Sequence, residues 1–452
     1  MRTLLAVITV LLVALALAPA AAFAAPVEPA SAAAFRDSVG VNTHVNYFDT
    51  AYARWPEIVQ KLDELGVDHL RDGAYNPAGW TAWNERYRGA VLLAASHGKR
   101  FTFVMGAPGW KAGSLPELLD VVAGPLRPAT EALEGPNEFD LESGLLDWAS
   151  PLRSYVADLR AGASADPRLA GLPIVGPSLV RRSSRDALGD VAAHADHGNL
   201  HAYAGGRPPS QAKLADEWWL AQKVTGTLPP WVTEAGFHDA QNATTGQPAV
   251  PEDVAAAYTL RTLLEHFRFG VPRTYLYELV DQKPDPAGTD PEQHFGLLRN
   301  DLSEKPAFSA LRNLLAVLGR PAAPGELEPV DITLGGDLDG LAALLLQEPG
   351  GRYRLVVWNT ASLWDTQQRV RTPVPARAVG ITIPAAAGAA VARPLVSADS
   401  EPVPLEAGRL AVDVPADPIV VTFALKGSPA AEGDGIAPLP KPGPDEAPPA
   451  GP

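Results

Sequence analysis

One pattern repeats eight times between residues 40 and 320: a short apolar segment, a polar loop and an amphipathic segment. Short apolar segments bounded by turn residues indicate buried strands, whereas apolar residues spaced three and four apart indicate helices. The expected strands are 40–45, 69–74, 101–106, 133–138, 173–179, 199–204, 231–237 and 274–280, and the expected helices are 55–65, 83–97, 115–123, 143–162, 184–195, 210–223, 251–269 and 306–318. Eight such units in about 280 residues favour a (β/α)8 TIM barrel, which typically takes ~250, over a doubly wound sheet.

The helical pattern ends near residue 320, and a different pattern follows. Residues 321–329 indicate a linker, after which alternating or apolar segments are separated by Gly, Pro and Asp. The expected strands here are 340–347, 353–359, 378–384, 409–414 and 419–425. Short strands at this spacing predict a small all-β sandwich domain over 321–426, in which Trp358 and Trp364 are expected to pack in the core.

The two ends of the chain differ from the rest. Arg2 precedes an apolar run over 3–18, and Ala22-Phe23-Ala24 has the small-residue spacing of a cleavage site. This predicts a signal peptide over 1–24, cut near Ala24, with a retained anchor helix as the alternative. The barrel would then occupy 25–320, and the proline-rich segment 427–452 is expected to be a disordered tail.

Composition excludes several classes of function. The chain has 452 residues, a formal net charge of −15 and no cysteine. The acidic balance disfavours nucleic acids and anionic membranes as partners, because both are bound by clustered cations. The lack of cysteine removes disulfides, thiolate metal sites and a cysteine nucleophile. No metal or other cofactor is expected, since the pair His194 and His197 precedes a strand at the wrong end of the barrel.

Polar side chains recur where the expected strands end, and barrels of this kind work at those ends. Residues two apart on a strand share a face, so the pair on the sixth strand points the same way. The candidates are His44 (first strand), Arg71 (second), Trp110 (after the third), Asn137 and Glu138 (fourth), His201 and Tyr203 (sixth), Glu234 (seventh), and Tyr277 and Glu278 (eighth).

Two of these candidates are glutamates, Glu138 and Glu234, separated by 96 residues. Three β-α units of about 31 residues span nearly that length, which places the pair across the barrel mouth. Two facing carboxylates can hydrolyse a glycosidic bond, because one protonates the leaving oxygen while the other attacks the sugar or activates water. Glutamates at strand ends also form structural ion pairs, and the conjunction with the other polar candidates favours the chemical interpretation.

Three segments resemble the strand ends of a known group of enzymes. Residues 134–140 (EGPNEFD), 232–236 (VTEAG) and 201–203 (HAY) look like those of the retaining (β/α)8 glycosidases of glycoside hydrolase clan A, which includes cellulases, mannanases, xylosidases and iduronidases. Residues 294–300 (HFGLLRN) resemble their last loop. The resemblance covers about 40–320 and identifies no single family within the clan.

The resemblance implies roles for the candidates. Glu138 would be the acid/base and Glu234 the nucleophile, with carboxyl groups ~5–5.5 Å apart. Asn137 would hydrogen-bond the sugar 2-hydroxyl. Arg71 would keep Glu234 ionised, because a nearby opposite charge lowers the pKa of a carboxyl group.

The resemblance also implies roles for Tyr203 and His201, and the sequence departs from the clan's pattern at two positions. Tyr203 would orient the nucleophile, and His201 would face the leaving group. Cellulase-like members often carry a His after the third strand, where residues 105–108 read MGAP. They also end the eighth strand with a Trp, where Tyr277 would be a smaller platform and Glu278 could bind a hydroxyl.

The prediction is a secreted bacterial glycosidase that acts as a monomer on an oligo- or polysaccharide. One alternative is a non-catalytic glycan-binding or cell-wall-associated protein on the same barrel. Another is a different barrel hydrolase whose two glutamates form structural pairs.

Overall fold

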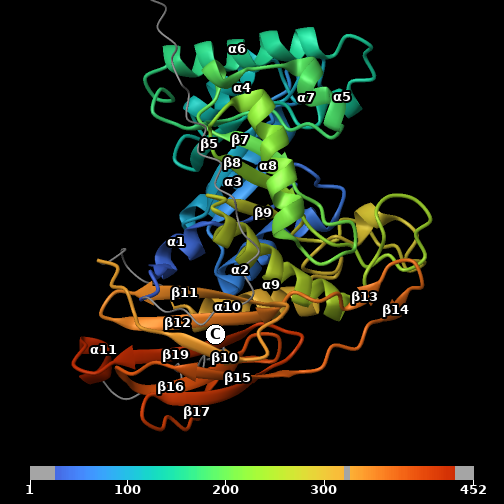
Figure 1. Ribbon diagram of the computed structural model, residues 1–452. Helices are drawn as coiled ribbons and strands as arrows, with labels where there is room; N and C mark the ends of the chain where they lie inside the picture. Colours follow the sequence, from blue (N-terminus) through green and yellow to red (C-terminus); the bar gives the residue numbers. More distant parts are fainter. Residues whose placement is uncertain (1–25, 320–325, 433–452) are drawn as a thin grey trace, which may run out of the picture.

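Figure 1 shows an α/β part above a layer of antiparallel strands in the computed structural model, which describes residues 26–319 and 326–432. The expected signal peptide, part of the linker and most of the expected tail lie outside the described residues. Residues 427–432 are described, and Pro429–Glu432 form the short helix α11. Within the described ranges, the model contains no helix with the length and apolarity needed to cross a membrane.

Eight strands form one parallel sheet in the order β6-β5-β4-β3-β2-β9-β8-β7. They are β2 (Val39–Asn42), β3 (His69–Gly73), β4 (Arg100–Val104), β5 (Thr130–Glu134), β6 (Ile174–Val175), β7 (Gly198–His201), β8 (Pro230–Ala235) and β9 (Thr274–Leu276). A parallel bridge between Val175 and His197 joins the two ends of this order, so the sheet closes on itself. The expected (β/α)8 barrel is confirmed.

Helices follow the strands and surround the barrel. They are α1 (Ala32–Asp37), α2 (Trp55–Leu65), α3 (Thr81–Ser96), α4 (Leu115–Ala123), α5 (Phe139–Glu142), α6 (Ala149–Ala165), α7 (Arg182–Leu188), α8 (Gln211–Thr225), α9 (Glu252–Phe269) and α10 (Pro306–Val317). The expected helix over 143–162 was wrong in its start: Gly144 has a φ of 65° between α5 and α6. The expected helix over 184–195 was too long, because α7 ends before Gly189, whose φ is 70°. Glycine adopts such left-handed conformations without steric cost.

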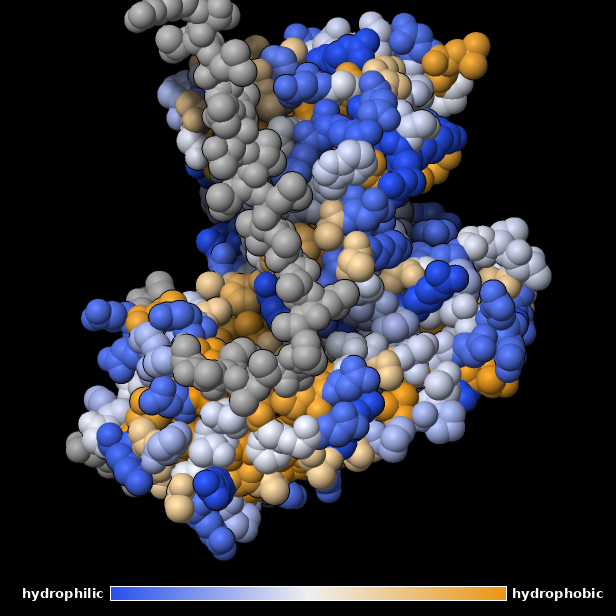
Figure 2. Space-filling view, viewed as in Figure 1, coloured by the Kyte–Doolittle hydropathy of each residue, from blue (hydrophilic) through white to orange (hydrophobic). Residues whose placement is uncertain are grey.

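The C-terminal strands form two sheets that pack face to face. One contains β1 (Ala30–Ser31), β11 (Leu341–Glu348), β12 (Arg352–Asn359), β19 (Ile419–Leu425), β16 (Ala386–Arg393) and β17 (Ser397–Val403), and the other β10 (Thr333–Gly336), β15 (Arg377–Thr382) and β18 (Arg409–Val414). Their inner faces share one core, to which Leu355 and Ile381 belong from opposite sheets, so the expected sandwich is confirmed. Figure 2 shows apolar colour over much of this part of the visible face.

Several strands of the sandwich were not predicted. In β16 five of eight residues are alanine, which is depleted in strands, so no sequence signal marked it. The edge strand β1 of the six-stranded sheet precedes the barrel in the sequence. It pairs in parallel with β11, and Val27 bridges to Val330. The segment that precedes the barrel therefore takes part in the sandwich.

The sandwich packs directly on the barrel. Trp358 of β12 is fully buried and donates a hydrogen bond to Glu265 of α9 at 2.9 Å. A separate hairpin, β13 (Trp364–Asp365) and β14 (Val370–Arg371), reaches farther along the barrel (Figure 1). Trp364 is buried in a cluster with Phe237 and Val250, so both tryptophans pack in cores as expected.

Four charged residues form a cluster at the N-terminal end of the barrel. His69 of β3 contacts Asp37 at 3.0 Å and Glu131 at 2.8 Å, and Arg273 contacts the same two carboxylates at 2.7 and 3.1 Å. Burial opposes the charge on His69, but its hydrogen bonds to Asp37 and Glu131 outweigh this and raise its pKa. The pKa of Asp37 is lowered, chiefly by the hydrogen bond from His69, and that of Glu131 is lowered despite its burial.

These pKa shifts predict how stability depends on pH. The contribution of His69 should be complete below its unfolded pKa of about 6.5 and be lost as pH rises through its higher folded pKa. The contributions of Asp37 and Glu131 should be complete above their unfolded pKa values near 4 and be lost at lower pH. The His69→Gln variant should therefore lose about 3 kcal/mol of unfolding free energy near pH 5.5 and less near pH 8.5, as measured by urea denaturation. A loss that stays constant across this pH range would contradict the linkage.

Candidate active site

The barrel gathers nearly all predicted site residues at the carboxyl ends of its strands. Arg71 lies on β3, His201 ends β7 and Glu234 lies on β8, while Glu138 follows β5 and Tyr277 follows β9. Parallel strands in a closed sheet bring these ends to one mouth of the barrel, so residues far apart in sequence become neighbours.

Arg71 is buried and uses all five of its N–H donors. Its Nε and Nη2 donate to the two carboxylate oxygens of Glu134 at 2.7 and 2.8 Å. Its Nη1 donates to Asn42 Oδ1 at 2.9 Å and to Glu234 Oε1 at 2.7 Å. Its Nη2 also donates to Asn137 Oδ1 at 2.7 Å. One cation thus joins side chains from β2, β5 and β8 with the loop after β5.

Glu134 is a member of this network that was not among the predicted site residues. Its side chain is fully buried, and besides the two bonds from Arg71 it accepts one from Asn199 Nδ2 at 2.9 Å. Asn199 in turn accepts a bond from Thr233 at 2.6 Å. The sequence offered one indication of this role, because Glu134 is a carboxylate inside an apolar strand segment. A buried acid requires a partner, and Arg71 was already a candidate on a neighbouring part of the barrel mouth.

Glu234 is held by Arg71 on one oxygen and by Tyr203 on the other. The hydroxyl of Tyr203 donates to Glu234 Oε2 at 2.7 Å, and His201 Nδ1 lies 3.4 Å from the same oxygen. Burial alone would raise the pKa of Glu234, but the charges of His201 and Arg71 and the hydrogen bonds from Tyr203 and Arg71 lower it. The pair expected between Arg71 and Glu234 is present, and the site favours an ionised carboxylate at this position.

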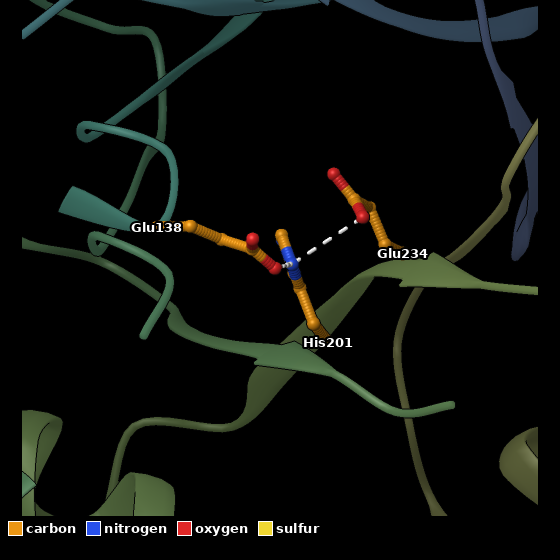
Figure 3. A group of neighbouring side chains, drawn as sticks. All are labelled: Glu138, His201 and Glu234. Atoms are coloured by element: carbon orange, nitrogen blue, oxygen red, sulfur yellow. Dashed lines mark hydrogen bonds and ion pairs between the residues drawn. The ribbon is translucent and has the colours of Figure 1, made fainter. Parts of the chain in front are cut away.

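Glu138 lies across the mouth from Glu234, with His201 between them (Figure 3). His201 Nδ1 is 2.6 Å from Glu138 Oε1, and only 4% of the His201 side chain is exposed. Burial opposes the charge on His201, but Glu234 and Glu138 outweigh it and raise the pKa of the imidazole. Glu138 has a φ of 39°, a left-handed conformation that costs energy in a residue other than glycine, and its N–H donates to Ser178 Oγ at 3.0 Å. Such strain is commonly found at functional positions.

The three side chains converge closely. One nitrogen of His201 and one oxygen each of Glu138 and Glu234 lie within 4.8 Å of one another. This spacing would also suit a metal ion, but a ligating imidazole must be deprotonated, whereas the raised pKa of His201 favours the proton. Arg71 already occupies one oxygen of Glu234. The residues present therefore suit a protonated imidazole between two carboxylates better than a metal ion.

Further carboxylates border this centre. Asn137 Nδ2 lies 3.3 Å from Glu142 Oε1, and the hydroxyl of Tyr277 donates to Glu292 Oε2 at 3.2 Å. Burial and the nearby charge of Glu138 raise the pKa of Glu142, and burial raises the pKa of Glu292. The Tyr277 ring packs edge-on against Phe295, with centroids 5.4 Å apart. Glu142 and Glu292 follow from no strand pattern, because Glu142 ends helix α5 and Glu292 lies in a short 3-10 helix.

Glu278 is fully buried and reaches the site through His44. Its Oε2 lies 3.2 Å from His44 Nε2 and 3.3 Å from the hydroxyl of Tyr52, and its Oε1 accepts from Gln282 at 3.1 Å. Burial opposes the charge on His44, but that of Glu278 outweighs it and raises the pKa of His44. His44 stacks on Tyr47 with ring centroids 4.6 Å apart.

Trp110 lies beside this centre rather than in it. It is half-buried against an apolar cluster that contains Phe139, the residue after Glu138. Within the described residues, Trp110 makes no hydrogen bond or ring contact with the other predicted site residues.

Similarity to known proteins appears in structure and not in sequence. No model of a known protein family matches the chain, and neither does any curated protein. A family 39 glycoside hydrolase from Bacteroides cellulosilyticus WH2 superposes with a TM-score of 0.57 at 14% identity, over 87% of this chain and 82% of that one. The GH39 enzyme from Xanthomonas axonopodis pv. citri gives 0.53 at 16% identity, over 88% and 96%.

A monomeric β-xylosidase from Caulobacter crescentus CB15 is also similar, with a TM-score of 0.52 at 14% identity over 89% of this chain and 98% of that one. At such identities the likeness establishes the fold. The expected resemblance to barrel glycoside hydrolases is confirmed at that level, and it extends over both the barrel and the sandwich.

The network around Arg71 predicts a large effect on stability. The Arg71→Met variant should lose about 3–5 kcal/mol of unfolding free energy, because Glu134 would remain buried without its cation. Urea denaturation at pH 7 measures this. As a control, Arg54→Met removes the exposed pair with Glu57 and should change the free energy of unfolding far less, because solvent screens such pairs. Equal losses in the two variants would contradict the central role of Arg71.

Proposed function

We propose that this protein is a secreted retaining glycoside hydrolase that cleaves an extracellular glycan by double displacement. One observation carries the proposal: oxygens of Glu138 and Glu234 lie within 4.8 Å of each other across the barrel mouth. Retaining glycosidases hold their two carboxyl groups ~5–5.5 Å apart, whereas inverting enzymes leave ~6.5–9.5 Å for a water molecule. The neighbours of the two groups differ, and Arg71 and Tyr203 favour the ionised form of Glu234.

In the first step Glu234 attacks the anomeric carbon of the sugar, and Glu138 gives its proton to the departing glycosidic oxygen. The bond that forms is a glycosyl ester to Glu234, and the bond that breaks is the glycosidic one. In the second step Glu138 takes a proton from water, and the resulting oxygen nucleophile displaces Glu234 from the anomeric carbon. The sugar retains its configuration, and both carboxyl groups return to their initial protonation states.

The surrounding residues support each role. Arg71 and Tyr203 hold the two oxygens of Glu234, so the nucleophile is ionised and oriented before substrate arrives. Arg71 donates to Asn137 Oδ1 and Asn137 Nδ2 donates one N–H to Glu142, which fixes the amide and leaves the second N–H of Nδ2 as the donor for the sugar 2-hydroxyl. His201 contacts both carboxylates and so links the proposed acid/base to the proposed nucleophile.

Other predicted residues would bind the sugar itself. Tyr277 borders the site between Tyr203 and Phe295 and offers an aromatic surface. Glu278 is buried and contacts His44, so we assign it the role of positioning His44. His44 would then bind a hydroxyl of the sugar in place of Glu278. The solved structures of similar fold include a glucosidase from Croceicoccus marinus and the Caulobacter β-xylosidase, which favours a neutral glycan as substrate. Export is inferred from the pattern of residues 1–24.

Removal of the proposed nucleophile tests the mechanism. The Glu234→Gln variant should lose at least about 10⁴-fold in kcat on a panel of aryl glycosides and glycans, with ligand binding retained. NMR of the first product should show retained anomeric configuration. Glu217→Gln, a half-buried carboxylate on α8, serves as control and should keep full activity. Equal activity in wild type and Glu234→Gln, or an inverted product, would refute double displacement, and glycan binding without turnover in wild type would favour a binding protein.

The pH profile tests the role of Tyr203. Activity requires ionised Glu234, so kcat/KM should fall at acid pH as this carboxylate becomes protonated. The hydrogen bond from Tyr203 lowers the pKa of Glu234. The Tyr203→Phe variant should therefore have its acid limb shifted to higher pH by about one to two units, because a hydrogen bond to a charged group contributes ~1.5–3 kcal/mol. An unchanged acid limb would exclude this role for Tyr203.

A further inference from the structure

Aromatic rings run from the candidate active site to the surface along the loops after β2 and β3. Tyr47 stacks on His44 of the site with an interplanar angle of 16°. Phe48 is next in the chain, and its ring lies 5.2 Å from that of Trp83. Trp83 meets Trp80 at 6.1 Å, with the two rings perpendicular. We call Tyr47, Phe48, Trp83 and Trp80 the aromatic track.

The middle of the aromatic track is packed against the protein, and its two ends face solvent. Phe48 is buried, and the guanidinium of Arg86 lies 3.9 Å from its ring centre. The two ends of the track are exposed: 39% of Tyr47 and 56% of Trp80 are accessible to solvent. Large aromatic side chains gain most from burial, so exposed rings held on a rigid base mark a surface that another molecule covers.

We propose that the aromatic track binds sugar units of the substrate that lie beyond the cleaved bond, with Trp80 as the distant platform. This rests on the proposed function as a glycosidase. One face of a pyranose ring carries C–H groups and stacks on an aromatic face, while its hydroxyls remain in water. Tyr47, the first residue of the track, stacks on His44 of the site and precedes Phe48 in the chain, which favours the same glycan chain as the ligand. The substrate class is therefore an uncharged oligo- or polysaccharide of several units.

The position of the track also assigns a direction. In the closed sheet, β2 and β3 lie opposite β6 and β7. Glu138 makes its contact with His201, which is on β7, so the leaving group that receives its proton lies on that side. The track holds the part of the glycan on the other side of the cleaved bond. A chain bound in this way is cut internally and releases oligosaccharides.

The test measures how activity and binding depend on chain length. The probes are β-1,4-xylo-, β-1,4-gluco- and β-1,3-gluco-oligosaccharides of two to six units. For the series that is hydrolysed, kcat/KM should rise at least about tenfold from the shortest chain to the longest. The Trp80→Ala variant should lose most of this rise and keep the activity on the shortest chain. Trp80→Phe, which retains an aromatic face, should restore it.

Trp219 provides a matched control, because it is 54% exposed but lies on α8 with Lys223 over its ring. Trp219→Ala should leave the chain-length dependence unchanged. The proposal is overturned if Trp80→Ala and wild type show the same dependence, if Trp219→Ala lowers it equally, or if the hydrolysed chains yield only monosaccharides.

Calorimetric binding of the same probes to Glu234→Gln, with and without Trp80→Ala, separates this proposal from the proposed function. If wild type hydrolyses none of the probes but Trp80→Ala weakens the binding of the longer ones about tenfold, the catalytic assignment fails and the track stands. If hydrolysis occurs and binding does not depend on Trp80, the track fails and the catalytic assignment stands. If none of the probes binds, the track is overturned.

Discussion

The side chain of Arg71 is the interaction on which the candidate site depends. A guanidinium buried in a barrel is costly unless every donor is satisfied, and here all five donors have oxygen partners. Glu134 neutralises the charge from a fully buried position, so Arg71 can hold Glu234 without an unbalanced cation in the core. The geometry of Glu234 is consequently determined by strands β3 and β5 as much as by its own strand.

This arrangement separates the two glutamates electrostatically. Glu234 is bound by Arg71 and Tyr203, which belong to the buried network inside the barrel. Glu138 instead follows β5 in a left-handed conformation, and among the described charged residues of the network it contacts His201. His201 contacts both carboxylates, so one imidazole links the two glutamates. Under the proposed mechanism these chemically identical side chains have different tasks, and they have different neighbours.

The periodic parts of the molecule were predictable from sequence, and the parts created by tertiary contact were not. The eight strand–helix units and the placement of Glu138 and Glu234 at one mouth follow from spacing alone. Strand β16 was not predicted because alanine is not favoured in strands. The conformation of β16 is determined instead by its pairing with β19. The partners of Glu134 and Glu278 could not be predicted for a related reason: only the folded chain shows that Glu134 binds Arg71 and that Glu278 contacts His44.

The hairpin formed by β13 and β14 blurs the division between the two domains. Trp364 packs under Phe237, which follows Glu234 by three residues, and Thr366 lies where a side chain on Gly206, three residues after Tyr203, would have to go. The loops after Glu234 and Tyr203 are thus backed by residues encoded more than a hundred positions later. In evolutionary terms the sandwich is not an interchangeable accessory: a recombination event that exchanged it at the linker would also exchange part of the wall behind the active site.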